Sequence, residues 1–175
     1  MQKILSIRGP LALLFVVAPA LTACDRPETA EVPSAPEEAS ITTAALVECP
    51  TDETRSSSAT VSLLGGVVNR LGATVSVPPE ALLAPITLDV AIPASQYMLV
   101  ELGVNGENHW QFLAPVTVTI NYSRCQVGLL DPPVHVWNVD PTTGELLEYM
   151  GGVDNRLLRR VTFTTDHFSG YAIAN

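Results

Sequence analysis

Residues 116–122 read Val-Thr-Val-Thr-Ile-Asn-Tyr, a strict alternation of apolar and polar side chains. Successive side chains of a β-strand point to opposite faces, so this stretch predicts a strand with one buried face and one solvated face. The same alternation occurs at 73–77, 86–92 and 161–164, and residues 171–173 read Tyr-Ala-Ile near the end of the chain. These segments predict an antiparallel sheet that packs on one side.

Glycine, proline and aspartate separate the alternating segments, as turns require. No long helical period occurs, although a single helical turn is expected near residues 79–82. About eight short strands within residues 59–175 predict an all-β domain, an antiparallel sandwich of two packed sheets. The expected turns are at Gly65-Gly66, 78–79, 131–133, 140–144 and 151–155.

The N-terminus has the pattern of a secretory signal. Lys3 and Arg8 precede an apolar run at 10–21, which is too short to span a bilayer as a helix. The run ends in Leu21-Thr22-Ala23-Cys24, which resembles the lipobox of bacterial lipoproteins. An ordinary secretory signal with a chance cysteine is the alternative.

The lipobox resemblance implies cleavage after residue 23 and a lipid on Cys24, where acyl chains such as palmitate form a stable anchor. Residues 1–23 are then a lipoprotein signal peptide. The expected location is the cell envelope, lipid-anchored to the inner or outer membrane and facing the periplasm or the exterior. Membrane lipid is accordingly the first expected partner.

Residues 24–58 are rich in proline, glutamate and serine and contain few large apolar side chains. Such a composition buries too little surface to offset the entropy of ordering, so we expect an acidic, disordered tether. Its end, residues 44–49, is apolar enough to dock on the domain that follows. The folded domain is expected at 59–175.

If Cys24 carries lipid, Cys49 and Cys125 remain as an even pair in an oxidising compartment. This arithmetic favours a disulfide that joins the end of the tether to the domain. Two free, buried thiols are the alternative.

A family resemblance covers roughly residues 60–125. The segments Gly65-Gly66, 72–82, 86–90 and 112–118, together with 167–171 near the end of the chain, resemble the ZU-five domain of zonula occludens proteins, netrin receptors and ankyrins. The resemblance implies a non-enzymatic interaction module. Glu80 stands where the family has glycine, so the backbone there is expected to differ.

The expected function is therefore that of a membrane-anchored envelope lipoprotein whose sandwich binds an envelope protein or polymer through a sheet edge or loop rim. A purely structural envelope stalk is one alternative. The other is an autoproteolytic module, because His167-Phe168-Ser169 resembles the tripeptide at which some eukaryotic relatives cut themselves. By that resemblance Ser169 is the nucleophile, His167 the base and Phe168–Ser169 the scissile bond. The structural interpretation is that Phe168 packs in the core and its neighbours bond the turn.

Other chemistry is not indicated. His109, His135 and His167 lack metal-ligand spacing, and no cofactor motif occurs. The formal net charge of −9, with Lys3 as the single lysine, argues against nucleic-acid binding. His135 and Trp137 are expected to be exposed or at a sheet edge. A basic cluster, Arg156, Arg159 and Arg160, offsets acidic neighbours or contacts an anionic partner.

Overall fold

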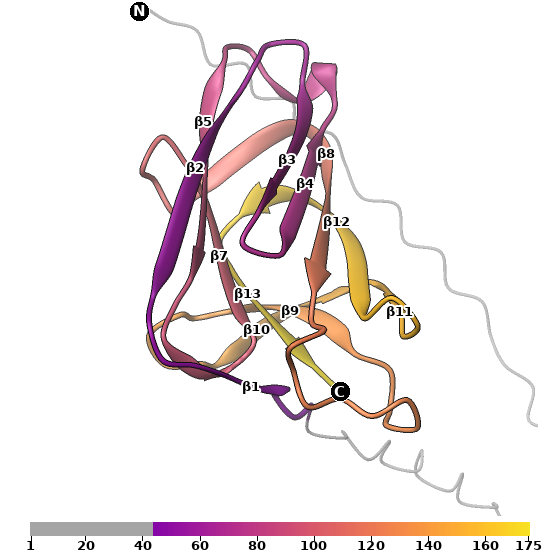
Figure 1. The fold of residues 1–175 in the computed structure, drawn as a ribbon. Coiled ribbons are helices and arrows are strands. Elements are labelled where there is room, and N and C mark those ends of the chain that lie inside the picture. Colours follow the sequence, from indigo (N-terminus) through magenta and orange to yellow (C-terminus); the bar gives the residue numbers. More distant parts are fainter. Residues whose placement is uncertain (1–43) are drawn as a thin grey trace, which may run out of the picture. The chain divides into compact units, whose positions relative to one another are not determined.

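Strands account for most of residues 44–175, the part of the chain that the computed structural model describes. Thirteen strands and one short 3-10 helix lie in this range (Figure 1). Hydrogen-bonded neighbours in all three sheets run antiparallel. The prediction of an all-β, antiparallel sandwich is confirmed.

The larger sheet contains six strands. From one edge to the other they are β10 (Leu146–Gly151), β9 (His135–Val139), β13 (Gly170–Ala174), β7 (Leu99–Val104), β5 (Ile86–Ile92) and β2 (Arg55–Val61). Strand β5 matches the alternating segment predicted at 86–92, and every second side chain in it is buried. Its apolar residues therefore face the second sheet.

The second sheet contains five strands. In order they are β11 (Val153–Asn155), β12 (Arg160–Phe168), β8 (Trp110–Asn121), β4 (Ala73–Val77) and β3 (Gly66–Arg70). The segment quoted first, 116–122, is the second half of β8 and the residue after it. The strand itself begins earlier, at Trp110, and pairs with both β12 and β4.

One hydrophobic core fills the space between the two sheets. Phe163 of β12 and Tyr171 of β13 meet edge to face across it, with ring centroids 5.1 Å apart. The burial of apolar side chains in such a core is the main favourable contribution to folding. Fully buried members from both sheets include Val75, Val118 and Ile120 on one side and Leu88, Leu102, Val136 and Ile173 on the other.

The boundary predicted between tether and domain is wrong, because the fold begins before residue 59. Strand β1 (Glu48–Thr51) pairs with β6 (Ser95–Tyr97), and β2 begins at Arg55. Strand β2 opens with Arg55 and three serines that are mostly exposed at the edge of the sheet, so its sequence carries no apolar signal. The expected docking of residues 44–49 is confirmed, since the Val47 amide donates to the Ile173 carbonyl at 3.0 Å.

The predicted turns are largely present. Asp140 accepts hydrogen bonds from the backbone amides of Thr142 and Thr143 at 2.7 and 3.0 Å, which closes the β9–β10 hairpin. The expected helical turn is the 3-10 helix Pro79–Ala81. The turn predicted at 151–155 is partly wrong, because Val153–Asn155 pairs with 160–162 as a short edge strand.

Candidate functional site

Ser169 is the single residue between β12 and β13, where the chain passes from one sheet to the other. Its hydroxyl donates to Asn138 Oδ1 at 2.7 Å and lies 3.3 Å from the Gly170 carbonyl oxygen. The residue is 8% exposed. An amide oxygen cannot remove a proton, so the partner of the Ser169 hydroxyl positions it without activating it.

His167 forms its hydrogen bonds with residues other than Ser169. Its Nδ1 lies 3.0 Å from Asp166 Oδ1, and this contact holds the pKa of the Asp166 carboxyl below its usual range. The His167 carbonyl oxygen accepts hydrogen bonds from Thr165 Oγ1 at 2.8 Å and from the Tyr171 hydroxyl at 2.5 Å. Within residues 44–175, no hydrogen bond joins His167 to Ser169.

Phe168 packs in the core, fully buried, with its ring centroid 4.7 Å from that of Phe112. The side chains of the tripeptide therefore serve the crossing between the sheets. Phe168 anchors it, while Ser169 and the His167 carbonyl bind neighbouring groups of the turn and strands. Burial of Phe168 agrees with the structural interpretation made from the sequence, but the His167 ring bonds the Asp166 side chain rather than turn backbone.

A cavity of about 230 Å³ lies beside the crossing. It brings His109 and Asp140 to the same hollow as Ser169, which the sequence did not predict. The Asp140 carboxylate is held by the turn amides of Thr143 and Thr142, and those hydrogen bonds lower its pKa. Within the described chain, this carboxylate therefore caps a turn.

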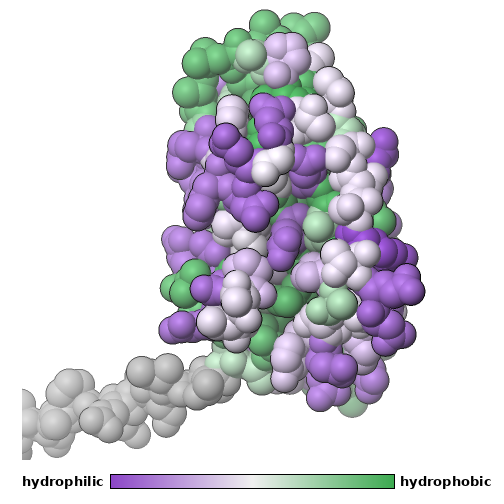
Figure 2. Space-filling view, turned by 90° about the vertical axis from the view of Figure 1, so that its left-hand side faces the viewer, coloured by the Kyte–Doolittle hydropathy of each residue, from purple (hydrophilic) through white to green (hydrophobic). Residues whose placement is uncertain are grey.

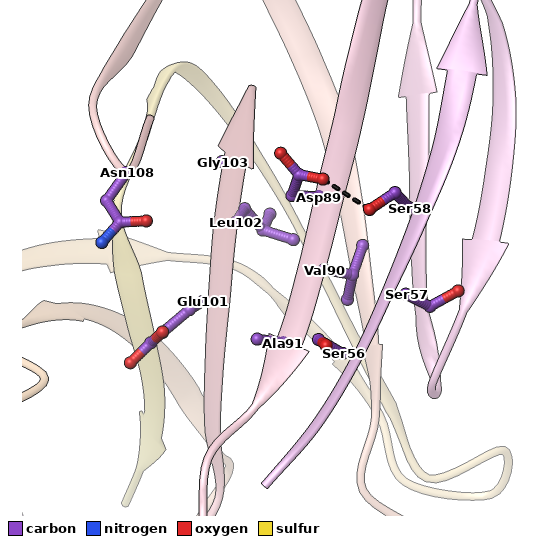
Figure 3. A pocket seen from close by; sticks show the side chains of 10 residues that line it. All are labelled: Ser56, Ser57, Ser58, Asp89, Val90, Ala91, Glu101, Leu102, Gly103 and Asn108. Atoms are coloured by element: carbon purple, nitrogen blue, oxygen red, sulfur yellow. Dashed lines mark hydrogen bonds between the residues drawn. The ribbon is translucent and has the colours of Figure 1, made fainter. Parts of the chain in front are cut away.

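A second hollow, of about 210 Å³, is lined by β2, β5 and β7 (Figure 3). Both carboxylate oxygens of Asp89, which lines this hollow, accept hydrogen bonds. One accepts from Ser58 Oγ at 2.6 Å and the other from the Gly106 amide at 2.8 Å. Glu101 lines the same hollow. Residues 44–175 contain no cluster of three or more histidine, cysteine, aspartate or glutamate side chains arranged to hold a metal ion.

The third cavity is apolar and also has a volume of about 210 Å³. It lies at the end of the molecule where the β2–β3 and β4–β5 connections meet, and Figure 2 shows hydrophobic residues gathered at this end. Leu83 and Leu113 line it and are 84% and 64% exposed. Trp110 also lines it, and its indole N–H is buried without a hydrogen-bond partner. We call this region the apolar end; Leu63 and Leu64 extend it.

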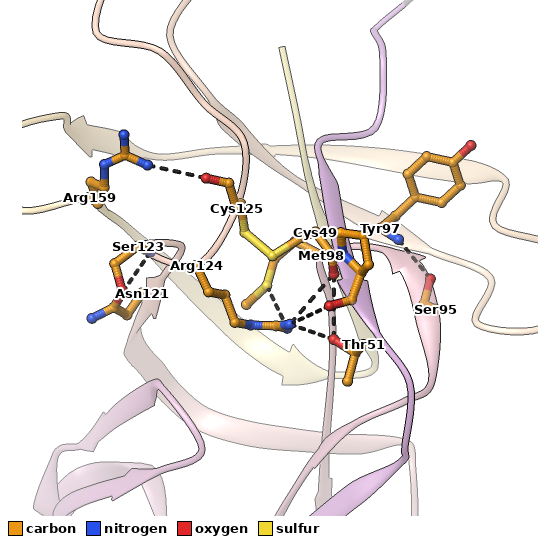
Figure 4. The surroundings of a disulfide bond; sticks show 11 residues. Cys49, Thr51, Ser95, Tyr97, Met98, Asn121, Ser123, Arg124, Cys125 and Arg159 are labelled. Atoms are coloured by element: carbon orange, nitrogen blue, oxygen red, sulfur yellow. Dashed lines mark hydrogen bonds between the residues drawn. A yellow bond between two sulfur atoms is a disulfide. The ribbon is translucent and has the colours of Figure 1, made fainter.

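Cys49 and Cys125 form the disulfide that the sequence favoured (Figure 4). The bond joins β1 to the segment after β8. Arg124 reinforces the junction: it donates to the carbonyl oxygens of Cys49 and Pro50, each at 3.5 Å, and to Thr51 Oγ1. Burial, with a smaller contribution from the positive charge of Arg55, lowers the pKa of Arg124.

Two side chains of the arginine cluster bind other residues of the domain. Arg156 Nε lies 3.3 Å from Asp154 Oδ2, as expected for a cation that offsets an acidic neighbour. Arg159 instead donates to the carbonyl oxygens of Cys125 and Val127 at 3.2 and 2.8 Å. Arg160 is exposed.

His135 and Trp137 are neither fully exposed nor on an edge strand, so that expectation is wrong. Strand β9 lies between β10 and β13, and both side chains are half-buried. Tyr149 of β10 covers them, with ring centroids 5.5 Å from His135 and 5.0 Å from Trp137. Pairing with β10, whose sequence lacks clear alternation, turned the expected edge into an interior position.

Residues 1–43, including the expected signal peptide and Cys24, lie outside the described residues. No helix within 44–175 has the length and hydropathy needed to cross a membrane. Searches against protein-family models and against curated proteins found no match to this chain. The resemblances to lipoproteins and to the ZU-five domain therefore stay predictions.

Proposed function

We propose that this protein is a lipid-anchored envelope protein whose β-sandwich binds a protein partner at its apolar end. The observation that carries the proposal is the cavity lined by Leu83, Leu113 and Trp110, because both leucines are mostly exposed. Soluble domains rarely leave contiguous apolar surface exposed without a use. A cavity with a mainly apolar lining suits an apolar side chain of a partner.

The position of the apolar end supports this role. The described chain starts beside the disulfide, where Ala45 exchanges backbone hydrogen bonds with Asn175, and Figure 1 places β1 at the opposite end of the molecule from the β2–β3 connection. A lipid on Cys24 would thus fix one end and present the other to a partner. The ZU-five resemblance, which implies an interaction module, agrees with this arrangement.

Two experiments test the proposal in the producing cells. For the anchor, Cys24→Ser should abolish incorporation of labelled palmitate and release the chain from the membrane fraction. Continued acylation of the variant would overturn the assignment of Cys24.

For the binding surface, a photo-crosslinking amino acid in place of Leu83 should give one discrete adduct. The same group in place of Thr143, in the exposed turn of the β9–β10 hairpin, is the matched control. The variant Leu113→Asp should remove the adduct formed from position 83. Equal crosslinking from both positions, or no effect of the aspartate, would contradict binding at the apolar end and would favour the structural stalk.

A further inference from the structure

Two neighbouring turns each expose a pair of leucines. Leu129 and Leu130 are 63% and 100% exposed in the connection between β8 and β9. Leu157 and Leu158 are 88% and 60% exposed between β11 and β12. We call these four side chains the leucine pairs; they lie apart from the apolar end and play no part in the function proposed above.

The turns are held together by well-defined hydrogen bonds. Arg156 donates to the carbonyl oxygens of Leu129 at 3.2 Å, of Pro132 at 2.9 Å, and of Asp131. The first turn is closed by Asp131 Oδ2, which accepts from the Gly128 amide at 2.6 Å, and the second by Asn155 Oδ1, which accepts from the Leu158 amide at 3.1 Å. The leucines are therefore presented outward by an ordered scaffold.

This scaffold continues to the point where the chain enters the domain. Arg159 binds the carbonyl oxygens of Cys125 and Val127, and Cys125 is joined by its disulfide to Cys49. The Gln126 amide also donates to the Glu48 carbonyl oxygen at 3.2 Å. The leucine pairs thus lie on the same connected structure as the start of the folded chain.

Charges of both signs surround the leucine pairs. Four arginines, Arg124, Arg156, Arg159 and Arg160, lie between residues 124 and 160 together with five carboxylates, and the whole chain has a net charge of −9. Arg160, which follows the second leucine pair at the start of β12, is exposed. Exposed leucines with a cation beside them match the boundary between acyl chains and the phosphates of the headgroups.

We propose that the leucine pairs insert into the surface of a lipid bilayer, with Arg160 at the phosphates of the headgroups. This inference rests on the anchoring part of the proposed function. Twenty residue steps separate Cys24 from residue 44 and span at most about 70 Å when fully extended. A domain tethered so closely experiences a high effective concentration of membrane, so weak insertion suffices to orient it. The apolar end then points away from the bilayer.

The test uses the full chain reconstituted into vesicles of phosphatidylcholine and phosphatidylglycerol, some with brominated acyl chains. An environment-sensitive fluorescent amino acid replaces Leu130 in one sample and Glu145, in the exposed β9–β10 hairpin, in the other. Bromine quenches only fluorophores that enter the acyl region. We expect severalfold stronger quenching at position 130 than at position 145.

Variants locate the contact. With the fluorophore in place of Leu158, the double variant Leu130→Asp and Leu157→Asp should abolish quenching. The matched double variant at the apolar end, Leu83→Asp and Leu113→Asp, should leave it unchanged. Arg160→Glu should weaken quenching on anionic vesicles and have little effect on vesicles of phosphatidylcholine alone.

Three other outcomes would contradict insertion of the leucine pairs. A chain that floats with the vesicles but shows equal quenching at positions 130 and 145 retains its anchor and overturns the inference alone. A chain that does not float overturns both the anchor and the inference. Energy transfer between labelled copies, without bromine quenching, would assign the leucine pairs to a second copy of this chain.

Discussion

Tyr122 donates a hydrogen bond from its hydroxyl to Asp154 and so connects the end of β8 to β11 across the intervening β12. The other Asp154 oxygen accepts from the Val134 amide at 3.1 Å and lies 3.3 Å from Arg156 Nε. The side chain of Asp154 is 4% exposed, so its charge is compensated almost entirely by these groups. One buried carboxylate thereby organises three segments beside the leucine pairs.

The first prediction concerns this carboxylate. Replacing Asp154 with alanine leaves the Tyr122 hydroxyl and the Val134 amide without their acceptor and Arg156 without its counter-charge. We expect the free energy of unfolding to fall by about 3 kcal/mol, as for other broken buried pairs. Urea denaturation measures this loss. Asp52→Ala, at an exposed position, is the control and should change stability by less than about 0.5 kcal/mol.

The second prediction concerns alkaline pH. Burial, aided at Tyr122 by the hydrogen bond to Asp154, raises the pKa values of Tyr122 and Tyr171 to about 12. In the unfolded chain both should ionise near pH 10, about the ordinary tyrosine value. Their contribution to stability is therefore complete below pH 10 and is lost as the pH rises from 10 towards 12.

Ultraviolet absorbance of tyrosinate follows this titration. Two of the four tyrosines should ionise only near pH 12 in the folded protein, and denaturant should bring their ionisation down towards pH 10. Identical titrations with and without denaturant would contradict the burial that the structure gives these hydroxyls.

The third prediction compares two glycines with the same backbone angle. Gly65 has φ +75° and Gly144 has φ +74°, a region that disfavours any side chain. A Cβ on Gly65 would lie 2.3 Å from the Val77 carbonyl oxygen, whereas a Cβ on Gly144 would meet nothing within 4 Å. Gly144→Ala should therefore reveal the backbone strain alone, about 1 kcal/mol.

Gly65→Ala should add the cost of the steric overlap, about 1–3 kcal/mol more. Urea denaturation of both variants measures the difference. Equal losses would show that the backbone yields to the added methyl group at the place where β3 begins and β4 ends. The close approach of Gly65 to Val77 would then not be needed for stability.

The alternating segments were predictable because the apolar–polar pattern within each segment is enough to indicate a strand with one buried face. Strands β4 and β5 agree with the predicted segments residue for residue. Strand β2 was missed because Ser56 and Ser58 face outward and its inward face begins with Ser57, so pairing with β5 rather than an apolar pattern decides its conformation. Strand β11 was missed because it is only three residues long and its pairing with β12, rather than a pattern of its own, decides its conformation.

Some features of the candidate sites were likewise predictable from the sequence, and others depended on contacts between distant segments. Cysteine counting found the disulfide because setting Cys24 aside as the expected lipid site leaves Cys49 and Cys125 as a pair. The cavity under Leu83 could not be found, since it depends on the meeting of the β4–β5 connection with Trp110 and Leu113 of β8. The leucine pairs are visible in the sequence as doublets, but only the Arg156 hydrogen bonds show that they are neighbours.

The fourth prediction concerns the disulfide. Cys49 and Cys125 are 76 residues apart in the sequence, and closing a loop of that length stabilises the fold by about 4 kcal/mol in the chain-entropy model. Reduction should lower the urea midpoint accordingly. The double variant Cys49→Ala and Cys125→Ala should show the lower midpoint with or without reductant. A native midpoint that does not respond to reductant would mean that the bond does not constrain the unfolded chain.

The final prediction concerns the integrity of the Phe168–Ser169 bond. The Ser169 hydroxyl is engaged by Asn138 and the His167 ring by Asp166, so the described geometry does not pair nucleophile with base. The strand that follows, Gly170–Ala174, is buried at every residue between β7 and β9. We expect denaturing mass spectrometry of the purified chain to show no loss of the segment Ser169–Asn175, and the variant Ser169→Ala to give the same pattern. Release of that segment from the native chain, but not from the alanine variant, would establish self-cleavage and return Ser169 and His167 to the roles that the tripeptide resemblance implies.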